Sequence, residues 1–296
     1  MKYGLVMPNF ASWFTPDNIR ATMSLAEELG YESAWVNDHV IFPGNMAAHY
    51  GNEFKDPLAI LPFMAACSTK LMLGTTILVI PYRPPVQTAK MLATIDYLSG
   101  GRLIIGTGPG HEPDESAALG LPYDERGPMT DEYMKVMVAL WTNERASFHG
   151  KYANFDDVQP LIHPVQKPFP QFYIGGNNLP TWRRIVEYGG GWHPSANNAE
   201  RLEKNVAELR KYCESKKAPF PEIAVRWSPL IVAEGEDASG SMQARGEMSW
   251  NRYTPTTAKE EIAKFEKLGV TRLVVNLPAA RGAYLDQLKN FAAAVM

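Results

Sequence analysis

An aspartate and a histidine stand side by side after a short apolar run, and they offer acid–base chemistry. Asp38 and His39 follow residues 33–36, which read as a strand. In a parallel α/β fold they would lie at the carboxyl end of that strand, where ligands bind. Imidazole ionises near neutral pH, so His39 can give or take a proton there. The alternatives are a structural, hydrogen-bonded histidine, and a turn or helix cap for Asp38.

A second candidate is the glycine-rich stretch 98–112. Two adjacent glycines in it are expected to end a helix, because glycine takes the left-handed cap conformation without a Cβ clash. Residues 102–105 then read as a buried strand, followed by glycines at alternate positions. A flat ligand could lie against such a bare loop. The dinucleotide fingerprint is not matched, because His111 stands where its third glycine is required. A tight turn that needs glycine only for its geometry is the other alternative.

A second glycine pair, Gly175 and Gly176, precedes an expected helix over 179–188. Amide groups at a helix start bind phosphate well, so the pair predicts a phosphate site. An ordinary turn that caps the helix has the same sequence, and the residues alone leave both readings open.

Strand and helix patterns alternate along the chain. Expected strands cover 3–7, 33–36, 71–80, 102–105, 172–176, 191–193, 223–233 and 272–277, and helices follow nearly all of them. This alternation and length predict a (β/α)8 TIM barrel, with an open doubly wound sheet as the runner-up. We find no linker, so we expect one domain over 1–296. Insertions are expected near 40–56, 143–170 and 234–256, the second with a β-hairpin and the third mobile and without a clear period.

Composition excludes several classes of function. The chain has 296 residues, is 45% hydrophobic and carries a net charge of −3 with both signs mixed, so we expect neither a nucleic-acid partner nor a membrane partner. Two distant cysteines and no signal-peptide pattern favour a reducing, cytoplasmic setting. No metal-ligand spacing and no G-x-S-x-G elbow occur, so a metal site and a serine hydrolase are not expected.

Short motifs spread over the whole chain together resemble the luciferase-like superfamily of flavin- and deazaflavin-dependent oxidoreductases. They are Gly4-Leu5 with Pro8, 34–39, 73–77, 83–85, 96–103 with 106–108, Leu140-Trp141, Gly175-Gly176 and Gly191-Trp192. The resemblance implies a TIM barrel with the cofactor ring in the barrel mouth. It is greatest to the branch that uses coenzyme F420, a deazaflavin, although FMN-dependent members share many motifs. Members are commonly dimers, which implies a homodimer.

The resemblance also implies roles for individual residues. His39 would lie by the reactive carbon of the ring, as an acid/base or a group that stabilises the transition state, and Asp38 would contact the hydroxylated chain of the cofactor. A cis peptide bond between Thr76 and Ile77 would support the back of the ring. The remaining cofactor contacts would come from the two glycine loops, namely Gly106, Thr107 and Gly108 near the ring or its chain, and Gly175 and Gly176 near the phosphate.

The substrate wall is less defined. Candidate wall residues are Trp13, Phe42, Glu112, His111, His193 and Tyr82. Aromatic residues suggest an apolar substrate, although loop aromatics often simply pack. A sugar phosphate is not supported, because Asn9 and Phe10 stand where one sugar-phosphate dehydrogenase group has an acid. The anionic tail of F420 calls for a basic rim, for which Arg83, Arg126, Arg183 and Arg184 are candidates; solvated surface charges are the alternative.

We therefore expect a hydride-transferring oxidoreductase that uses coenzyme F420 and a small organic substrate. The first alternative is an FMN-dependent monooxygenase that uses O2, in which the 234–255 insertion could act as a lid. The second is a barrel that binds a flavin or deazaflavin without turnover. The residues leave the substrate and the direction of hydride transfer open.

Overall fold

The computed structural model describes residues 1–42, 53–196, 198–243, 249–278 and 283–296. The strands in these ranges are β1 (Lys2–Val6), β2 (Ser33–Val36), β3 (Met72–Thr75), β4 (Leu78–Val79), β5 (Leu103–Gly108), β6 (Ala146–His149), β7 (Asn154–Val158), β8 (Gln171–Ile174), β9 (Gly191–Trp192), β10 (Ile223–Trp227), β11 (Pro229–Ile231), β12 (Ser241–Gln243), β13 (Ser249–Tyr253) and β14 (Val270–Val275). The helices are α1 (Pro16–Glu28), α3 (Pro57–Cys67), α4 (Pro85–Ser99), α5 (Pro113–Ala118), α6 (Arg126–Thr142), α7 (Leu179–Tyr188), α8 (Glu200–Lys216), α9 (Pro255–Lys267) and α10 (Tyr284–Val295), with short 3₁₀ turns at Ile80–Tyr82 and Tyr123–Glu125.

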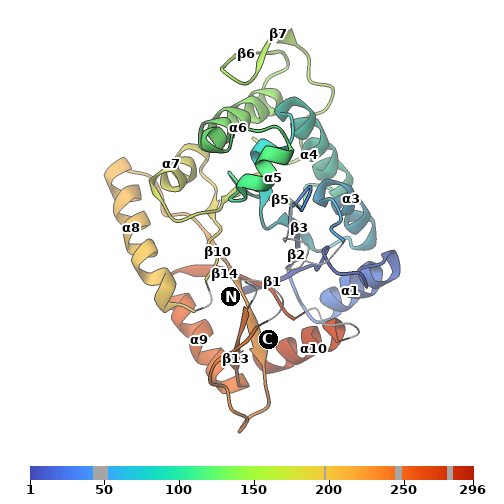
Figure 1. The fold of residues 1–296 in the computed structure, drawn as a ribbon, viewed down its shortest axis with the longest axis vertical. Helices are drawn as coiled ribbons and strands as arrows, with labels where there is room; N and C mark the ends of the chain where they lie inside the picture. Colours follow the sequence, from blue (N-terminus) through green and yellow to red (C-terminus); the bar gives the residue numbers. More distant parts are fainter. Residues whose placement is uncertain (43–52, 197, 244–248, 279–282) are drawn as a thin grey trace.

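The main sheet closes into a parallel barrel. Its neighbours run β3, β2, β1, β14, β10, β9, β8 and β5, and a β3–β5 pairing completes the ring. Helices surround this ring, with α1, α3, α4, α6, α7, α8, α9 and α10 on the outside (Figure 1). The closed ring confirms the predicted TIM barrel and rules out the open doubly wound sheet.

Aromatic side chains fill the inside of the barrel, and glycines on neighbouring strands make room for them. A Cβ on Gly74 would lie 2.3 Å from the Trp35 ring, and one on Gly191 would lie 2.3 Å from the Tyr173 ring. Below them, Arg272 pairs with Glu32 and donates to the Tyr173 hydroxyl at 2.8 Å. These buried groups fill the centre of the barrel, and in this fold ligands bind at the carboxyl ends of the strands.

The ends of the helices follow local sequence signals. Thr15 caps α1, and Thr254 forms a capping box with Thr257 at the start of α9. Helix α4 ends at Gly100, which adopts the left-handed conformation with φ 68° and ψ 36°. The predicted stop at the paired glycines is confirmed, and it delivers the chain directly into β5.

Two expected strands are each divided in the structure. The run 71–80 forms β3 and β4, interrupted at a cis peptide bond between Thr76 and Ile77, and its last residue enters a 3₁₀ turn. The run 223–233 forms β10 in the barrel and β11 in a second sheet, where β11 pairs with β13. The run 71–80 is mostly apolar and largely buried on both sides of its break, and most of the run 223–233 is apolar too, so hydrophobicity alone hides both breaks.

The insertions contain more regular structure than the sequence pattern indicated. Strands β6 and β7 form the expected antiparallel hairpin, which projects at one end of the molecule (Figure 1). The insertion near 234–256 was expected to lack a period, but its described residues include β12 and β13, which pair with each other. Much of the insertion near 40–56, and the centre of the third insertion, lie outside the described residues.

Candidate functional site

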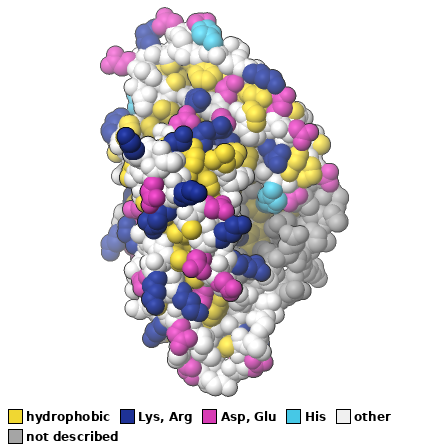
Figure 2. Space-filling model, turned by 90° about the vertical axis from the view of Figure 1, so that its left-hand side faces the viewer, with side chains coloured by type: hydrophobic (Ala, Val, Ile, Leu, Met, Phe, Trp, Pro, Cys, Tyr) yellow, Lys and Arg dark blue, Asp and Glu magenta, His cyan; other side chains and the backbone are white. Residues whose placement is uncertain are grey.

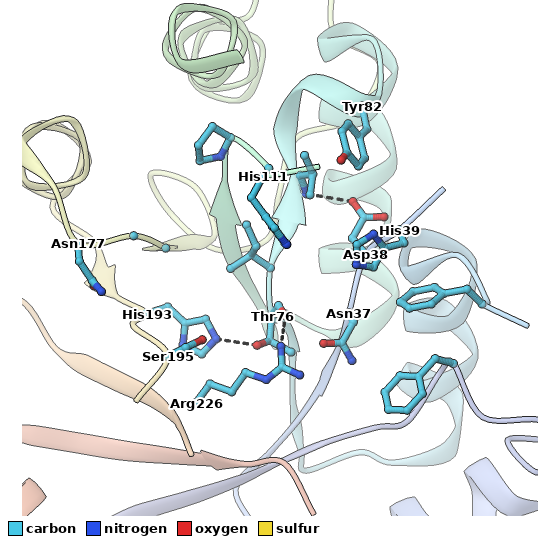
Figure 3. Close-up of a pocket in the computed structure, with 18 residues that line it drawn as sticks. Asn37, Asp38, His39, Thr76, Tyr82, His111, Asn177, His193, Ser195 and Arg226 are labelled. Carbon is cyan, nitrogen blue, oxygen red and sulfur yellow. Dashed lines mark hydrogen bonds between the residues drawn. The ribbon is translucent and has the colours of Figure 1, made fainter. Parts of the chain in front are cut away.

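A cavity of about 620 Å³ opens at the carboxyl ends of the barrel strands (Figure 3). We call it the barrel-mouth cavity. It is lined by Phe10, Asn37, Asp38, His39, Phe54, Thr76, Ile77, Val79, Tyr82, Pro109, Gly110, His111, Gly175, Gly176, Asn177, His193, Ser195 and Arg226. Its size lies in the range typical of sites for small molecules and cofactors.

His39 is held by a buried carboxylate. Its Nδ1 lies 2.8 Å from Oε2 of Glu115, and the Glu115 side chain is fully buried. Since a carboxylate only accepts hydrogen bonds, Nδ1 carries the proton, and proton exchange with a ligand falls to Nε2. This arrangement, in which an acid fixes the tautomer and orientation of a histidine, is the one that acid–base catalysis uses.

Glu115 also organises the chain around His39. Its Oε1 accepts from the backbone N–H groups of Val40 at 2.7 Å and Ile41 at 3.2 Å, and its Oε2 accepts from the Tyr82 hydroxyl at 2.9 Å. Burial raises the pKa of Glu115, but the His39 hydrogen bond and charge, the Val40 N–H and the Tyr82 hydroxyl outweigh it, so that pKa lies below its usual range. Glu115 is therefore an ionised partner at neutral pH.

The acid that the sequence predicted at the cavity wall is a different one from the same loop. Glu112 stands at the start of α5, pairs with His111 at 2.9 Å and is not among the residues that line the cavity. Glu115 was missed because an acid in the first turn of a short helix is a common surface feature. The signal that could have found Glu115 is its position a few residues after the glycine loop, because that loop leads α5 back over the barrel mouth.

Asp38 lines the cavity, and its carboxylate points at Arg83. The two oxygens accept from Nη1 at 2.7 Å and Nη2 at 2.8 Å of that guanidinium, and one also accepts from the Val79 N–H at 3.0 Å. Arg83 makes a further bond to Asp56 at 2.6 Å. Asp38 thus joins the end of β2 to β4, and a contact with the cofactor chain remains a prediction.

The segment between β3 and β4 forms part of the cavity wall. The peptide bond between Thr76 and Ile77 is cis, as the family resemblance implies. Thr76 places its hydroxyl 2.9 Å from Nε2 of His193, and Ile77 presents its side chain beside Gly175. Both residues line the cavity, and Figure 3 shows Thr76 between His193 on one side and Asn37 on the other.

The first glycine loop lines the cavity through its later residues, and a cofactor contact of the earlier ones stays a prediction. Gly106, Thr107 and Gly108 lie in β5 and are not among the lining residues; Pro109 and Gly110 line the cavity instead. A Cβ on Gly106 would lie 1.8 Å from the Thr75 carbonyl oxygen, and one on Gly108 would lie 2.6 Å from Ile77. These two glycines are therefore needed for close packing of β5 against β3 and the Thr76–Ile77 segment.

The second glycine pair lies on the opposite side of the mouth. Gly175, Gly176 and Asn177 line the cavity just before α7, whose first turn is capped by Asn178. Gly176 has a φ of +112°, which side-chain-bearing residues rarely adopt. The amino-terminal end of α7 thus follows directly on the cavity wall, and its dipole favours an anion there.

Three further residues complete this side of the cavity. His193, expected as a wall residue, is joined by Ser195 and Arg226, which were not predicted from the sequence (Figure 3). Arg226 directs Nη1 toward the Thr76 carbonyl oxygen at 3.4 Å. A single charged residue within the apolar strand Ile223–Trp227 was the signal that could have found it.

The remaining candidates lie off the wall. Trp13 packs against Tyr284 with ring centroids 5.2 Å apart, and Phe42 packs beside His39 at 5.2 Å.

None of the four arginines expected at a basic rim lines the cavity. They bind elsewhere: Arg83 to Asp38 and Asp56, Arg126 over the ring of Tyr123, and Arg183 and Arg184 to Asp131. The expected wall residues His111 and Tyr82 do line it.

The surface shows mixed charge. Figure 2 shows basic and acidic side chains interspersed over one face. This face carries no extended basic patch of the kind that attracts nucleic acid. Among the described residues, no helix is both long enough and apolar enough to cross a bilayer.

Comparison with known proteins gives a consistent family. A family model described as luciferase-like monooxygenase matches residues 1–291. An uncharacterized Mycobacterium tuberculosis protein, Rv0953c, is 30% identical over 258 residues, which cover 79% of this chain and 90% of that protein. The F420-dependent glucose-6-phosphate dehydrogenase of Amycolatopsis mediterranei is 32% identical over 184 residues, 61% of this chain and 52% of that protein.

A flavin-dependent relative and a solved structure extend the comparison. The FMNH2-dependent dimethylsulfone monooxygenase of Pseudomonas putida is 28% identical over 203 residues, 67% of this chain and 54% of that protein. The crystal structure of monooxygenase RslO1 from Streptomyces bottropensis has a TM-score of 0.82 at 20% identity, covering 99% of this chain and 98% of that one, which shows a shared fold. From the barrel, its mouth cavity and the match over 1–291, the chain belongs to the luciferase-like monooxygenase family, whose relatives include F420-dependent and FMN-dependent enzymes.

Proposed function

We propose that the chain is an oxidoreductase that transfers a hydride between coenzyme F420 and a small organic substrate. The observation that carries the proposal is the buried Glu115 carboxylate 2.8 Å from Nδ1 of His39, at the wall of the barrel-mouth cavity. Hydride transfer from an alcohol carbon also releases the hydroxyl proton, so the reaction needs a base placed beside the substrate. His39 meets that need with a fixed tautomer.

Each residue at this wall has a distinct part in the proton transfer. His39 takes the substrate proton at Nε2 during oxidation and returns it during reduction. Glu115 keeps Nδ1 protonated and stabilises the imidazolium that forms, and the Tyr82 hydroxyl holds the carboxylate in place. The deazaflavin, when bound, supplies the carbon that accepts or donates the hydride.

The residues present fit a flat anionic cofactor. Ile77 and Val79 offer apolar surface to a ring, while Gly175, Gly176 and Asn177 at the start of α7 offer a seat for its phosphate. Arg226 adds positive charge on that side. In this proposal Asp38 supports the ring wall through Arg83 and Val79, whereas Gly106, Thr107 and Gly108 act through the packing of β5.

We propose a cytoplasmic homodimer built from one domain, on the family resemblance and on the two described cysteines, Cys67 and Cys213, both of which are free thiols. Phe54 lines the cavity beside His39, and Phe42 packs against both rings, so this side favours a substrate with an apolar portion.

A second candidate is an FMN-dependent monooxygenase that uses O2. It is supported by the description of the matching family and by the similarity to the FMNH2-dependent dimethylsulfone monooxygenase. The third candidate, a barrel that binds a flavin or deazaflavin without turnover, would use the same cavity but would not need the His39–Glu115 pair.

An activity screen separates the three candidates. The purified chain is incubated with F420 and a panel of small alcohols, and with reduced F420 and the matching carbonyl compounds, while the cofactor absorbance is followed. Turnover with F420 supports the proposal. Turnover only with FMNH2 and O2 moves the assignment to the monooxygenase, and bound cofactor without turnover across both panels supports the third candidate.

A further inference from the structure

His193 lies on the opposite wall from His39 and has a hydrogen-bond partner at each ring nitrogen. Its Nδ1 lies 2.5 Å from the Ala224 carbonyl oxygen, and its Nε2 lies 2.9 Å from the Thr76 hydroxyl. The side chain stacks on Trp35 with ring centroids 5.1 Å apart and planes 21° apart. The ring is therefore fixed in orientation as well as in position (Figure 3).

These contacts determine the direction of each hydrogen bond. A carbonyl oxygen only accepts, so Nδ1 of His193 must carry a proton and donate it to Ala224. In a neutral ring Nε2 is then an acceptor, and the Thr76 hydroxyl must donate its one proton to it. The single proton of that hydroxyl is then used, and the hydroxyl oxygen can only accept a hydrogen bond from a ligand.

The surroundings of His193 favour a neutral ring. Burial is the largest effect and lowers the pKa of His193; the bond to the Ala224 carbonyl opposes it, and the charges of Arg226 and Arg272 lower the pKa further, to about 4. The ring is consequently neutral at physiological pH.

From this geometry we infer that Thr76 faces the barrel-mouth cavity as a hydrogen-bond acceptor, kept in that role by His193, and selects a ligand edge that carries an N–H or O–H. A hydrogen-bond acceptor on the ligand would be repelled by the lone pairs of the Thr76 oxygen, whereas a donor on the ligand would form a hydrogen bond with that oxygen. Oxidised flavins and deazaflavins both carry an imide N–H on the ring, so both qualify. Thr76 and His193 are thus a specificity-determining pair, and for its choice of probe the inference rests on the proposed function.

The test compares variants that differ in one oxygen atom. Dissociation constants for oxidised F420 and FMN are measured for the wild type, Thr76→Val, Thr76→Ser and His193→Phe. Thr76→Val keeps the side-chain shape without the hydroxyl and should raise the dissociation constant of the cofactor about fivefold to tenfold. Thr76→Ser, the matched control, should stay within about twofold of the wild type. His193→Phe keeps the stacking but releases the hydroxyl proton, and should weaken binding by about threefold.

A cofactor-free measurement completes the test. Two-bond ¹H–¹⁵N NMR of ¹⁵N-histidine-labelled protein, assigned with His193→Phe, should find the His193 proton on Nδ1 and an unprotonated Nε2. A proton on Nε2, or equal cofactor affinity for Thr76→Val and the wild type, would overturn the inference. If the wild type binds neither cofactor, the proposed function fails, and the NMR result alone decides the role of His193.

Discussion

Two histidines face each other across the barrel mouth, and the protein treats them in opposite ways. His39 lies against a buried carboxylate, which holds its Nδ1–H and leaves Nε2 for proton exchange with a ligand. His193 lies against a carbonyl and a hydroxyl, and two arginines oppose its protonation. The same side chain is therefore prepared to move a proton on one wall and to hold a fixed hydrogen-bond pattern on the other. The difference resides in the partners, which come from distant parts of the chain.

The largest effect should come from removing the histidine that exchanges protons. His39→Ala should lower turnover by about 10²–10⁴-fold, the usual contribution of a general acid or base, while cofactor affinity changes little. Single-turnover and binding measurements on the same variant check this. Unchanged turnover would show that His39 is a structural residue and would remove the contrast between the two walls.

Breaking the ion pair behind His39 should chiefly affect stability. Arg83→Met leaves the Asp38 carboxylate buried without its partner and should lower the free energy of unfolding by about 3–5 kcal/mol. Urea unfolding measures the loss. Adding Asp38→Asn to Arg83→Met should recover much of it; a double variant no more stable than Arg83→Met would mean that the pair is not what stabilises this wall.

Neutralising the Glu115 carboxylate should slow turnover while His39 stays in place. Glu115→Gln should lower turnover by about 10–100-fold, as expected when a group that orients an active histidine is lost. The matched control is Glu112→Gln, three residues earlier and outside the cavity wall, which should change turnover by less than about twofold. The pH–rate profile should shift more for Glu115→Gln than for Glu112→Gln, since Glu115 is the carboxylate in direct contact with His39. Similar losses for both variants would contradict the assignment of Glu115.

The neutral state of His193 should make the free energy of unfolding depend on pH in the acid range. An unfolded histidine takes up a proton near pH 6.5, whereas the pKa of His193 is lowered to about 4 in the fold. The unfolded state binds more protons between these values, so stability falls as the pH drops through this window. Between pH 7.5 and 5 the wild type should lose about 2 kcal/mol more than His193→Phe, measured by urea unfolding. Equal losses would mean that His193 is not held neutral.

The sequence predicted the elements of the barrel better than the partners within its mouth. Alternating strands and helices required a parallel sheet, and the chain length favoured closure into a barrel. His39 and Asp38 were predictable because both follow directly on a strand. Glu115 was not, because it reaches His39 from 76 residues away along the chain and a short helix gives no pattern to place it. Thr76 and His193, 117 residues apart, meet for the same reason of tertiary packing.

The glycines illustrate the same limit in another way. Gly106 and Gly108 were expected against a cofactor, but their missing Cβ atoms make room for Thr75 and Ile77 of the neighbouring strand segment. Glycine is required both where a ligand approaches and where two backbones approach. The packed structure shows the second use at Gly106 and Gly108 and places Gly110 of the same loop at the cavity, while a cofactor contact of the first two stays a prediction.

The most direct test of the account is a side-by-side titration of the purified chain with oxidised F420 and oxidised FMN, followed by the change in cofactor fluorescence. The account predicts tight binding of F420 and weak binding of FMN. Binding of neither cofactor would contradict the assignment of the barrel-mouth cavity as a cofactor site, and tight binding of FMN alone would contradict the choice of F420.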